Sequence, residues 1–398
     1  MKNKFKKALK FNFAVLLVFS MLLSGCTGKN NSKDSNEKKT TPTEEKGGSS
    51  TTKEITDMRG KKITIPKDPK RVVIIDKGFV LQNMVAMKVE DRIVATGGII
   101  DSKEKKEKRD SITLFPKVYD LPLVGYPIKA VDFEAIASVK PDLVILRNSE
   151  YIKDNEITKK AIDTIENQLK IPLVVVNGSG CYEKVELERH YEGIKLLGEV
   201  FNKEQRADEI IKLMKEQVDL VKERTSDIKE EDKPKVMYIS LLKGNEVGSV
   251  WGRDMGDGKF VREFAGIKNA YDEHKKTKMS SEQLLTLNPD VIILSTSTVV
   301  PHINILKNEE YKNISSINAI KNDRIASLGL LTWWGDWRLE VPIILTISAK
   351  TAYPEKFKDI KVSEFVDKYH KKLYGLSDEK IKELREVQLL SWMEERGF

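Results

Sequence analysis

The 398-residue sequence is short of the side chains from which many functional sites are built. Its two cysteines are too few for the disulfide framework of a small secreted domain. Its four histidines are scattered, and no two of them have the spacing of a helical metal site, so a zinc site made of protein side chains alone is not expected. No Gly-x-x-x-x-Gly-Lys pattern is present, which excludes a phosphate-binding loop of that type.

The chain also lacks a long run of one charge. Its formal net charge is +8, but part of the excess is a group of lysines within the first ten residues, and the rest is spread thinly. Because no Lys/Arg run is interleaved with aromatic residues, nucleic-acid binding is not indicated. The 40% hydrophobic and 33% charged residues are typical of a soluble globular body, and the length suffices for two domains.

The first 26 residues divide into a lysine-rich head, an apolar run and a short segment that ends in Cys26. The apolar run, residues 11–23, is shorter than the roughly 20 residues of a transmembrane helix and has the form of a signal peptide. Leu23-Ser24-Gly25-Cys26 resembles the bacterial lipobox, whose cysteine is lipidated. We therefore expect Cys26 to anchor the protein at the extracellular face of the cell membrane. An ordinary secretory signal that happens to contain a cysteine is the alternative.

Residues 27–53 are Lys, Ser, Thr, Asn, Glu and Gly with almost nothing apolar. Such a segment buries too little surface to offset the entropy lost on ordering. The composition predicts a disordered tether between the lipid and a globular body.

Buried parallel strands are indicated in both halves of the remaining chain. Alternating residues near 55–66 predict a half-exposed hairpin, and short β-branched runs with helical patterns between them predict an α/β fold. The predicted buried strands are residues 72–75, 93–95, 143–146 and 173–176 in the first half, and 235–240 and 291–294 in the second.

One segment occurs twice. Residues 132–145 align with residues 280–293, and the same offset of 148 separates Glu134 from Glu282 and Pro141 from Pro289. Each copy predicts a short helix, then Pro-Asp, then a strand. A repeated unit of this kind predicts two lobes of similar build.

A helical stripe of apolar residues lies between the lobes, from Lys203 to about Thr225. A helix of that length spans about 35 Å, enough to join two lobes stiffly, so we predict limited lobe closure. The expected organisation is a signal peptide and lipobox (1–26), a tether (27–53), an N-terminal lobe (54–202), a connecting helix (203–230) and a C-terminal lobe (231–398), with a ligand cleft between the lobes.

These pieces together resemble class III substrate-binding proteins of ABC importers, which serve ferric siderophores, haem and cobalamin. The resemblance rests on Asp57-Met58-Arg59-Gly60 with Pro69-Lys70-Arg71-Val72-Val73, on the doubled unit and on the connecting helix, and it covers residues 54–398. It implies a protein without enzymatic activity that hands its ligand to a membrane permease and its ATPase. It also implies that Glu134 and Glu282 dock onto arginines of that permease. The alternative for each acid is a favourable place in the first turn of a helix.

Ligand contacts are expected in loops at the carboxyl ends of the strands. Rigid aromatic rings there would pack against a chelate, and arginines would pair with its negative charge. The candidates are Phe79, Tyr126, Arg147, Cys181 and Tyr182 in the first lobe, and Trp251, Arg253, Trp333, Trp334, Trp337 and Arg338 in the second. An internal ion pair with Asp336 or Glu340 is the alternative for Arg338.

Cys181 allows two further hypotheses. It is either a small buried residue or an axial ligand to haem iron or cobalt. With His190 it also suggests a secreted thiol hydrolase, but the two residues would not share a helical face and no orienting acid is evident.

The sequence thus favours a monomeric lipoprotein that captures an iron–siderophore complex or related metal chelate, with no cofactor of its own and no direct protein ligand to the metal. A corrinoid or haem in the same role is the nearest alternative. A ligand-sensing module for a membrane receptor is an alternative from another class, and it would not need Glu134 and Glu282.

Overall fold

The computed structural model describes residues 51–398 apart from 99–109, 128–129, 149–154, 179–180, 183–185, 241–247, 253–255, 275, 296–302 and 332–337. The predicted signal peptide, Cys26 and nearly all of the predicted tether lie outside the described residues. Ser50–Phe398 form one compact unit. None of the helices in the described part is both long enough and apolar enough to span a bilayer.

We call residues 51–202 the first lobe and residues 231–398 the second lobe. The first lobe is built on a parallel sheet of order β4-β3-β7-β8, comprising β3 (Val72–Ile75), β4 (Ile93–Gly97), β7 (Leu143–Asn148) and β8 (Leu173–Asn177). Its helices are α1 (Phe79–Ala86), α2 (Asp110–Leu114), α3 (Phe133–Ser138), α4 (Glu156–Asp163) and α5 (Leu187–Phe201). Two antiparallel hairpins complete it, β1 (Thr52–Thr56) with β2 (Lys62–Pro66) and β5 (Gly125–Tyr126) with β6 (Ala130–Val131).

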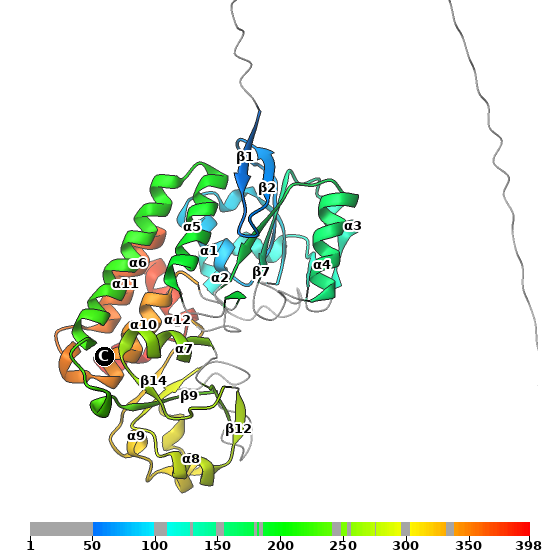
Figure 1. Ribbon diagram of the computed structural model, residues 1–398. Coiled ribbons are helices and arrows are strands. Elements are labelled where there is room, and N and C mark those ends of the chain that lie inside the picture. Colours follow the sequence, from blue (N-terminus) through cyan, green and yellow to red (C-terminus); the bar gives the residue numbers. More distant parts are fainter. Residues whose placement is uncertain are drawn as a thin grey trace, which may run out of the picture. The chain divides into compact units, whose positions relative to one another are not determined.

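Both faces of the first sheet are covered, as β-branched runs without alternation predict. Val72–Ile75 are fully buried. Figure 1 shows α3 and α4 on one side of the first-lobe strands and α1 and α5 on the other. Val73 and Ile75 pack in one core with Ile136 of α3, while Val72 and Ile74 belong to another core that contains residues of α1 and α5. This second core continues through α6 into the second lobe.

The second lobe has a mixed six-stranded sheet of order β12-β10-β9-β13-β14, with β11 also paired to β9. The strands are β9 (Lys235–Ser240), β10 (Gly248–Val250), β11 (Lys268–Asn269), β12 (Thr277–Met279), β13 (Val291–Leu294) and β14 (Ile325–Ser327). The helices are α7 (Gly256–Ala265), α8 (Ser281–Leu287), α9 (Asn318–Lys321), α10 (Val341–Ala352), α11 (Val362–Tyr374), α12 (Asp378–Val387) and α13 (Trp392–Glu395).

The duplicated segment has the same build in both lobes, as predicted. α3 leads into β7 and α8 leads into β13, and the residues before the two prolines, Lys140 and Asn288, are both left-handed with φ of 45° and 40°. The Asp after each proline then binds the start of the neighbouring strand. The backbone N–H of Asp142 donates to Arg71, and that of Asp290 donates to Lys235, each over 2.9 Å.

The predicted connecting helix is α6 (Glu204–Thr225), whose 22 residues span about 33 Å. Its buried stripe, Ala207 to Val221, packs on α5 of the first lobe and on α7 and α10 of the second. The turn between α5 and α6 is tight, because a side chain on Gly198 would come within 2.7 Å of Ala207 Cβ. Limited lobe closure stays a prediction.

Candidate ligand-binding site

The carboxyl edge of the first sheet begins with Asp76, directly after β3. Its carboxylate is fully buried and accepts hydrogen bonds from the backbone N–H groups of Gly78, Val80 and Leu81 over 2.8, 2.9 and 3.1 Å. The negative charge satisfies the free N–H groups at the start of α1 and interacts favourably with the helix dipole. A protein carboxylate therefore occupies the N-terminus of α1 and fixes the loop that carries Lys77.

Phe79 and Arg147, both predicted ligand residues, are stacked on one another beneath this edge. The Arg147 guanidinium carbon lies 3.8 Å from the centre of the Phe79 ring, and both side chains are fully buried. Arg147 also donates to the backbone oxygen of Asn177 over 2.8 Å. His190 also contacts Phe79 edge-on, with 5.0 Å between the ring centres. Burial and the Arg147 charge lower the pKa of His190 to about 3, so this imidazole is neutral at physiological pH.

Lys77 adds a second cation to the first-lobe edge. Its side chain is 8% exposed, and its Nζ lies 5.0 Å from the centre of the Tyr126 ring. Tyr126, another predicted ligand residue, is half-buried on β5. The aromatic face offsets part of the desolvation of the ammonium group. The edge thus holds two positive charges that are largely removed from water.

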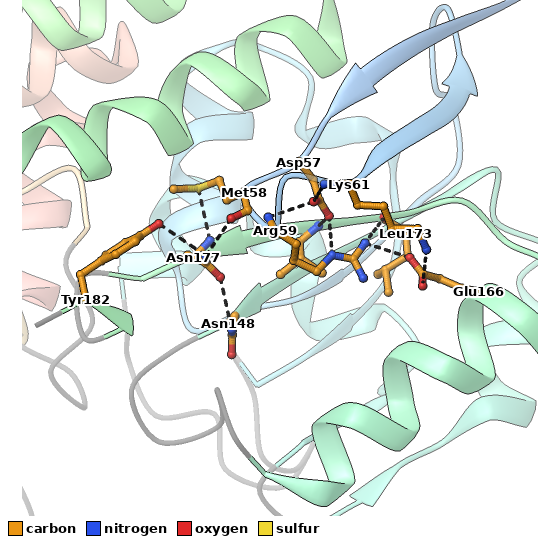
Figure 2. A network of polar contacts seen from close by, with 10 residues as sticks. Asp57, Met58, Arg59, Lys61, Asn148, Glu166, Leu173, Asn177 and Tyr182 are labelled. Atoms are coloured by element: carbon orange, nitrogen blue, oxygen red, sulfur yellow. Dashed lines mark hydrogen bonds and ion pairs between the residues drawn. The ribbon is translucent and has the colours of Figure 1, made fainter.

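Asn177, at the end of β8, links the predicted ligand residue Tyr182 to two other segments. Figure 2 shows Met58, Asn148 and Tyr182 converging on it. Its side-chain NH₂ donates to the Met58 backbone oxygen over 3.0 Å and to the Tyr182 hydroxyl over 3.4 Å, and its side-chain oxygen accepts from Asn148 over 3.2 Å. Cys181 donates in turn to the Asn148 backbone oxygen, with 3.5 Å between sulfur and oxygen. One amide therefore orients the loops that carry Cys181 and Tyr182.

The turn after β1, which contains Met58, is itself held in place by ion pairs and hydrogen bonds. Asp57 is buried and accepts from the side chain of Arg59 over 2.6 Å and from the backbone N–H of Val175 over 3.1 Å. Arg59 also pairs with Glu166 over 2.8 Å (Figure 2). The Asp57-Met58-Arg59-Gly60 motif is thus a brace that fastens the N-terminal hairpin to β8.

The carboxyl edge of the second sheet carries hydroxyl groups instead. Ser240, Ser295 and Ser327 follow or end the adjacent parallel strands β9, β13 and β14, and each is at most 2% exposed. Ser240 accepts from the indole N–H of the predicted ligand residue Trp251 over 3.2 Å. Ser327 accepts from the backbone N–H of Gly329 over 3.2 Å. The hydroxyls hold the loops of this edge without adding charge.

Arg338 forms an internal ion pair, which was the alternative weighed for it, but with a different acid. Its Nη1 lies 2.9 Å from Asp110 of α2, whereas Asp336 lies outside the described residues. Its Nη2 donates to the backbone oxygens of Leu330 and Leu331 over 2.8 and 2.9 Å. The remaining predicted ligand residues, Arg253, Trp333, Trp334 and Trp337, lie outside the described residues.

The two predicted docking acids sit in equivalent surroundings. Glu134 and Glu282 are exposed and lie in the first turns of α3 and α8. Asp132 caps the first helix, and Ser280 with Gln283 forms a capping box on the second. A hydrogen bond from Ser280 lowers the pKa of Glu282, which is therefore charged at neutral pH. Helix capping accounts for the local structure, and both carboxylates are exposed to a partner.

Sequence reasoning missed six residues at these edges: Lys77, Asn148, Asn177, Ser240, Ser295 and Ser327. Lys77, Asn148, Asn177 and Ser295 follow predicted strands and Ser240 ends one, so their position was a signal that could have pointed to them. Ser327 ends β14, a strand that was not predicted. In the part of the chain that is described, no group of three or more His, Cys, Asp or Glu side chains could hold a metal ion.

Comparison with known proteins decides the family. The profile of the periplasmic binding protein family matches residues 73–329. This chain belongs to that family.

Curated relatives of this periplasmic binding protein cover most of both chains. The molybdate-binding protein MolA of Haemophilus influenzae is 26% identical over 81% of this chain and 91% of its own. The ABC transporter substrate-binding lipoprotein YvrC of Bacillus subtilis is 25% identical, over 87% and 98%. The petrobactin-binding protein YclQ of the same organism is 23% identical, over 80% and 90%. The solved MolA structure superposes with a TM-score of 0.63 over 82% of this chain and 98% of that one, at 24% identity, and so shares the fold.

The family confirms the two-lobe α/β fold and the role in an ABC importer. Its members are transport components that deliver a ligand to a permease, not enzymes. The thiol hydrolase built on Cys181 and His190 is therefore not carried further. Relatives that are named lipoproteins indicate a place outside the cytoplasm and at the membrane.

Proposed function

We propose that this binding protein captures an anionic, oxygen-rich metal complex, with an iron–siderophore chelate as the first candidate. The observation that carries the proposal is the pair of largely buried cations at the first-lobe edge, Lys77 and Arg147. A ferric chelate presents carboxylate, catecholate or hydroxamate oxygens and a net negative charge, which ammonium and guanidinium groups bind well. The relative YclQ, named for petrobactin, supports this class.

A compact metal oxyanion is the second candidate. The same two cations would suit it, and the relative MolA is named for molybdate. Hydroxyl groups on the opposite sheet would then complete the hydrogen bonds to the anion. Haem and corrinoids remain alternatives for a larger ligand.

A fluorescence titration separates these candidates, because Trp251 lies at the second-lobe edge. The purified mature protein is titrated with ferric citrate, ferric hydroxamate and catecholate siderophores, molybdate, haem, cobalamin and bare divalent metals. We expect saturable quenching by one iron chelate. Saturation by molybdate alone would favour the oxyanion, and saturation by a bare metal would contradict both candidates.

Lys77→Met tests the electrostatic part of the proposal, and Lys195→Met, an exposed cation on α5, is the matched control. Removing a charge-assisted hydrogen bond should weaken binding of the quenching probe about tenfold in Lys77→Met and leave the control unchanged. Added salt should weaken binding to the parent and have less effect on Lys77→Met. Equal affinities in the two variants would remove Lys77 from the site.

The same proposal assigns roles outside the site. Cys26 would carry the lipid anchor, residues 27–53 would form the tether, and a monomer would present Glu134 and Glu282 to arginines of the permease. Glu134→Ala combined with Glu282→Ala should abolish uptake of the bound probe by cells while leaving its affinity intact. Uptake at the parent rate would contradict docking by these acids and would favour a sensing module.

A further inference from the structure

A cluster of buried polar side chains joins the two lobes. Gln82 of α1 and Asp110 of α2 come from the first lobe, and Arg338, Glu340 and Tyr374 come from the second. Gln82, Glu340 and Tyr374 are at most 1% exposed, and Arg338 is 6% exposed. Burying this much polar surface costs free energy unless the groups bind one another, so their geometry is strongly constrained.

Gln82 lies at the centre of the cluster. Its side-chain oxygen accepts from the backbone N–H of Leu339 over 3.1 Å. Its side-chain NH₂ donates to Asp110 and to Glu340, each over 2.9 Å. This single amide therefore binds an acid of its own lobe, an acid of the other lobe and the backbone of the other lobe.

The Gln82 amide also helps to stabilise the buried charges of the cluster. One cation, Arg338, faces two acids, and it forms its ion pair with Asp110. The donors to Glu340 in the described part of the chain are neutral, because its Oε1 accepts from Gln82 and from the Tyr374 hydroxyl over 2.9 and 3.0 Å. Its Oε2 has no hydrogen-bond partner among the described residues. Loss of Gln82 would leave a buried carboxylate with a single donor, which is costly.

The contact between the lobes is also sterically exact at Arg338. A side chain on Gly78, at the start of α1, would lie 2.9 Å from Arg338 Cδ, and Gly78 has a φ of 126° that disfavours any other residue. Apolar contacts in the shared core are non-directional, whereas the hydrogen bonds of this cluster weaken steeply when their geometry changes.

We propose that the Gln82–Asp110–Arg338–Glu340 cluster is an interlobe latch that holds the two lobes in one arrangement, with Gln82 as a positioning residue for ligand binding. The latch keeps the edges that carry Lys77 and Trp251 at a constant separation before the ligand arrives. Its role in affinity rests on the proposed function, whereas its role in lobe geometry does not.

The test measures lobe geometry directly. Glu134→Cys and Glu282→Cys place spin labels on exposed first turns of α3 and α8, in a Cys26→Ser, Cys181→Ser background of the mature chain. Pulsed electron–electron double resonance without ligand should give a single narrow distribution of distances between the two labels in the parent. Gln82→Met keeps the side-chain length but removes the amide, and it should broaden that distance or add a second one.

Gln217→Met is the matched control, because the Gln217 amide joins α6 to Thr346 of α10 over 2.8 Å and does not touch the latch. Its distance distribution should stay narrow, as should that of Glu340→Gln, which retains the acceptor for Gln82. If Gln82→Met does not fold, Asp110→Asn and Tyr374→Phe each weaken one bond of the cluster and should give the same broadening to a smaller degree. A distribution in the latch variants as narrow as in Gln217→Met would overturn the latch.

Titration with ferric citrate adds the functional measurement. If the latch variants populate the binding-competent arrangement about one fifth of the time, affinity for ferric citrate should fall about fivefold. Broadened distances with unchanged affinity would keep the latch and reject its role in binding. A parent that binds none of the iron chelates in the fluorescence panel would count against the proposed ligand class and leave the distance result as the decision on the latch.

Discussion

The carboxyl edges of the two sheets do the same structural task with different chemistry. The first-lobe edge uses charges and amides, namely Asp76, Lys77, Arg147 and Asn177, of which the last three contact residues outside their own loops. The second-lobe edge uses Ser240 and Ser327, which each accept one nearby N–H. At the opposite ends of the sheets, however, the helix–Pro-Asp–strand units are built alike. The two lobes therefore share their outer ends and differ where the ligand is proposed to bind.

The largest difference in stability between the two edges should come from removing the helix cap of the first lobe. Asp76→Ala would leave three backbone N–H groups at the start of α1 without their acceptor, and we expect it to lower the free energy of unfolding by about 3 kcal/mol. Ser327→Ala removes one acceptor at the other edge and should cost about 1 kcal/mol. Urea denaturation measures both. Equal losses of unfolding free energy would mean that the two side chains stabilise their edges equally.

The next largest effect concerns pH and the latch between the lobes. Burial raises the pKa of Glu340 from an ordinary 4.5 to about 6, with Asp110 adding to the effect and Arg338 opposing it. Gln82, Tyr374 and Tyr369 also face this carboxylate. Because the folded protein holds the proton more tightly than the unfolded chain, the stabilising contribution of protonated Glu340 is complete below pH 4.5 and is lost as the pH rises through 6.

Glu340→Gln isolates this contribution from the buried histidines, whose pKa values near 3 act in the opposite direction. Between pH 4.5 and 7.5 the parent should lose about 2 kcal/mol of unfolding free energy relative to Glu340→Gln. Chemical denaturation of both proteins at several pH values gives the difference. A constant difference across that range would show that Glu340 titrates as it does in water.

The smallest expected effect is a difference in ligand affinity between variants of the two edges. Asn177→Ala frees the loops of Cys181 and Tyr182, and we expect about fivefold weaker binding of the probe that quenches the parent, or about 1 kcal/mol. Ser240→Ala frees only the Trp251 indole and should change affinity less than about twofold. Fluorescence titration compares the two. A larger loss in Ser240→Ala would place the more important contacts on the second lobe.

Local patterns were sufficient for much of the fold. Val72–Ile75, Val291–Leu294 and the apolar stripe of α6 were recognisable because each buries a continuous run or a helical face. The strands β10, β12 and β14 have three residues each, too few for a period to be visible. Their pairing with β9, β13 and one another depends on tertiary contacts.

The sequence predicted which positions lie at the candidate site but not which side chains contact one another there. The rule that ligands meet the carboxyl ends of strands identified Phe79 and Arg147, but it did not reveal that they stack on each other. Gln82 carried no signal at all, because its partners Leu339 and Glu340 are more than 250 residues away and a glutamine inside a helix is an ordinary surface residue in a sequence. Long-range pairing of neutral amides is the part that one sequence leaves hidden.

The core that runs from the first lobe through α6 into the second has a consequence for modular exchange. If one lobe were transplanted into a relative, its half of the shared core would pack against side chains of another sequence. The chimaera would then contain cavities or steric clashes in that core. We expect the parent to melt in one calorimetric transition for the same reason. New ligand preferences in such a scaffold would come from exchanging the loops after β3, β7 and β9, while the lobes are inherited together.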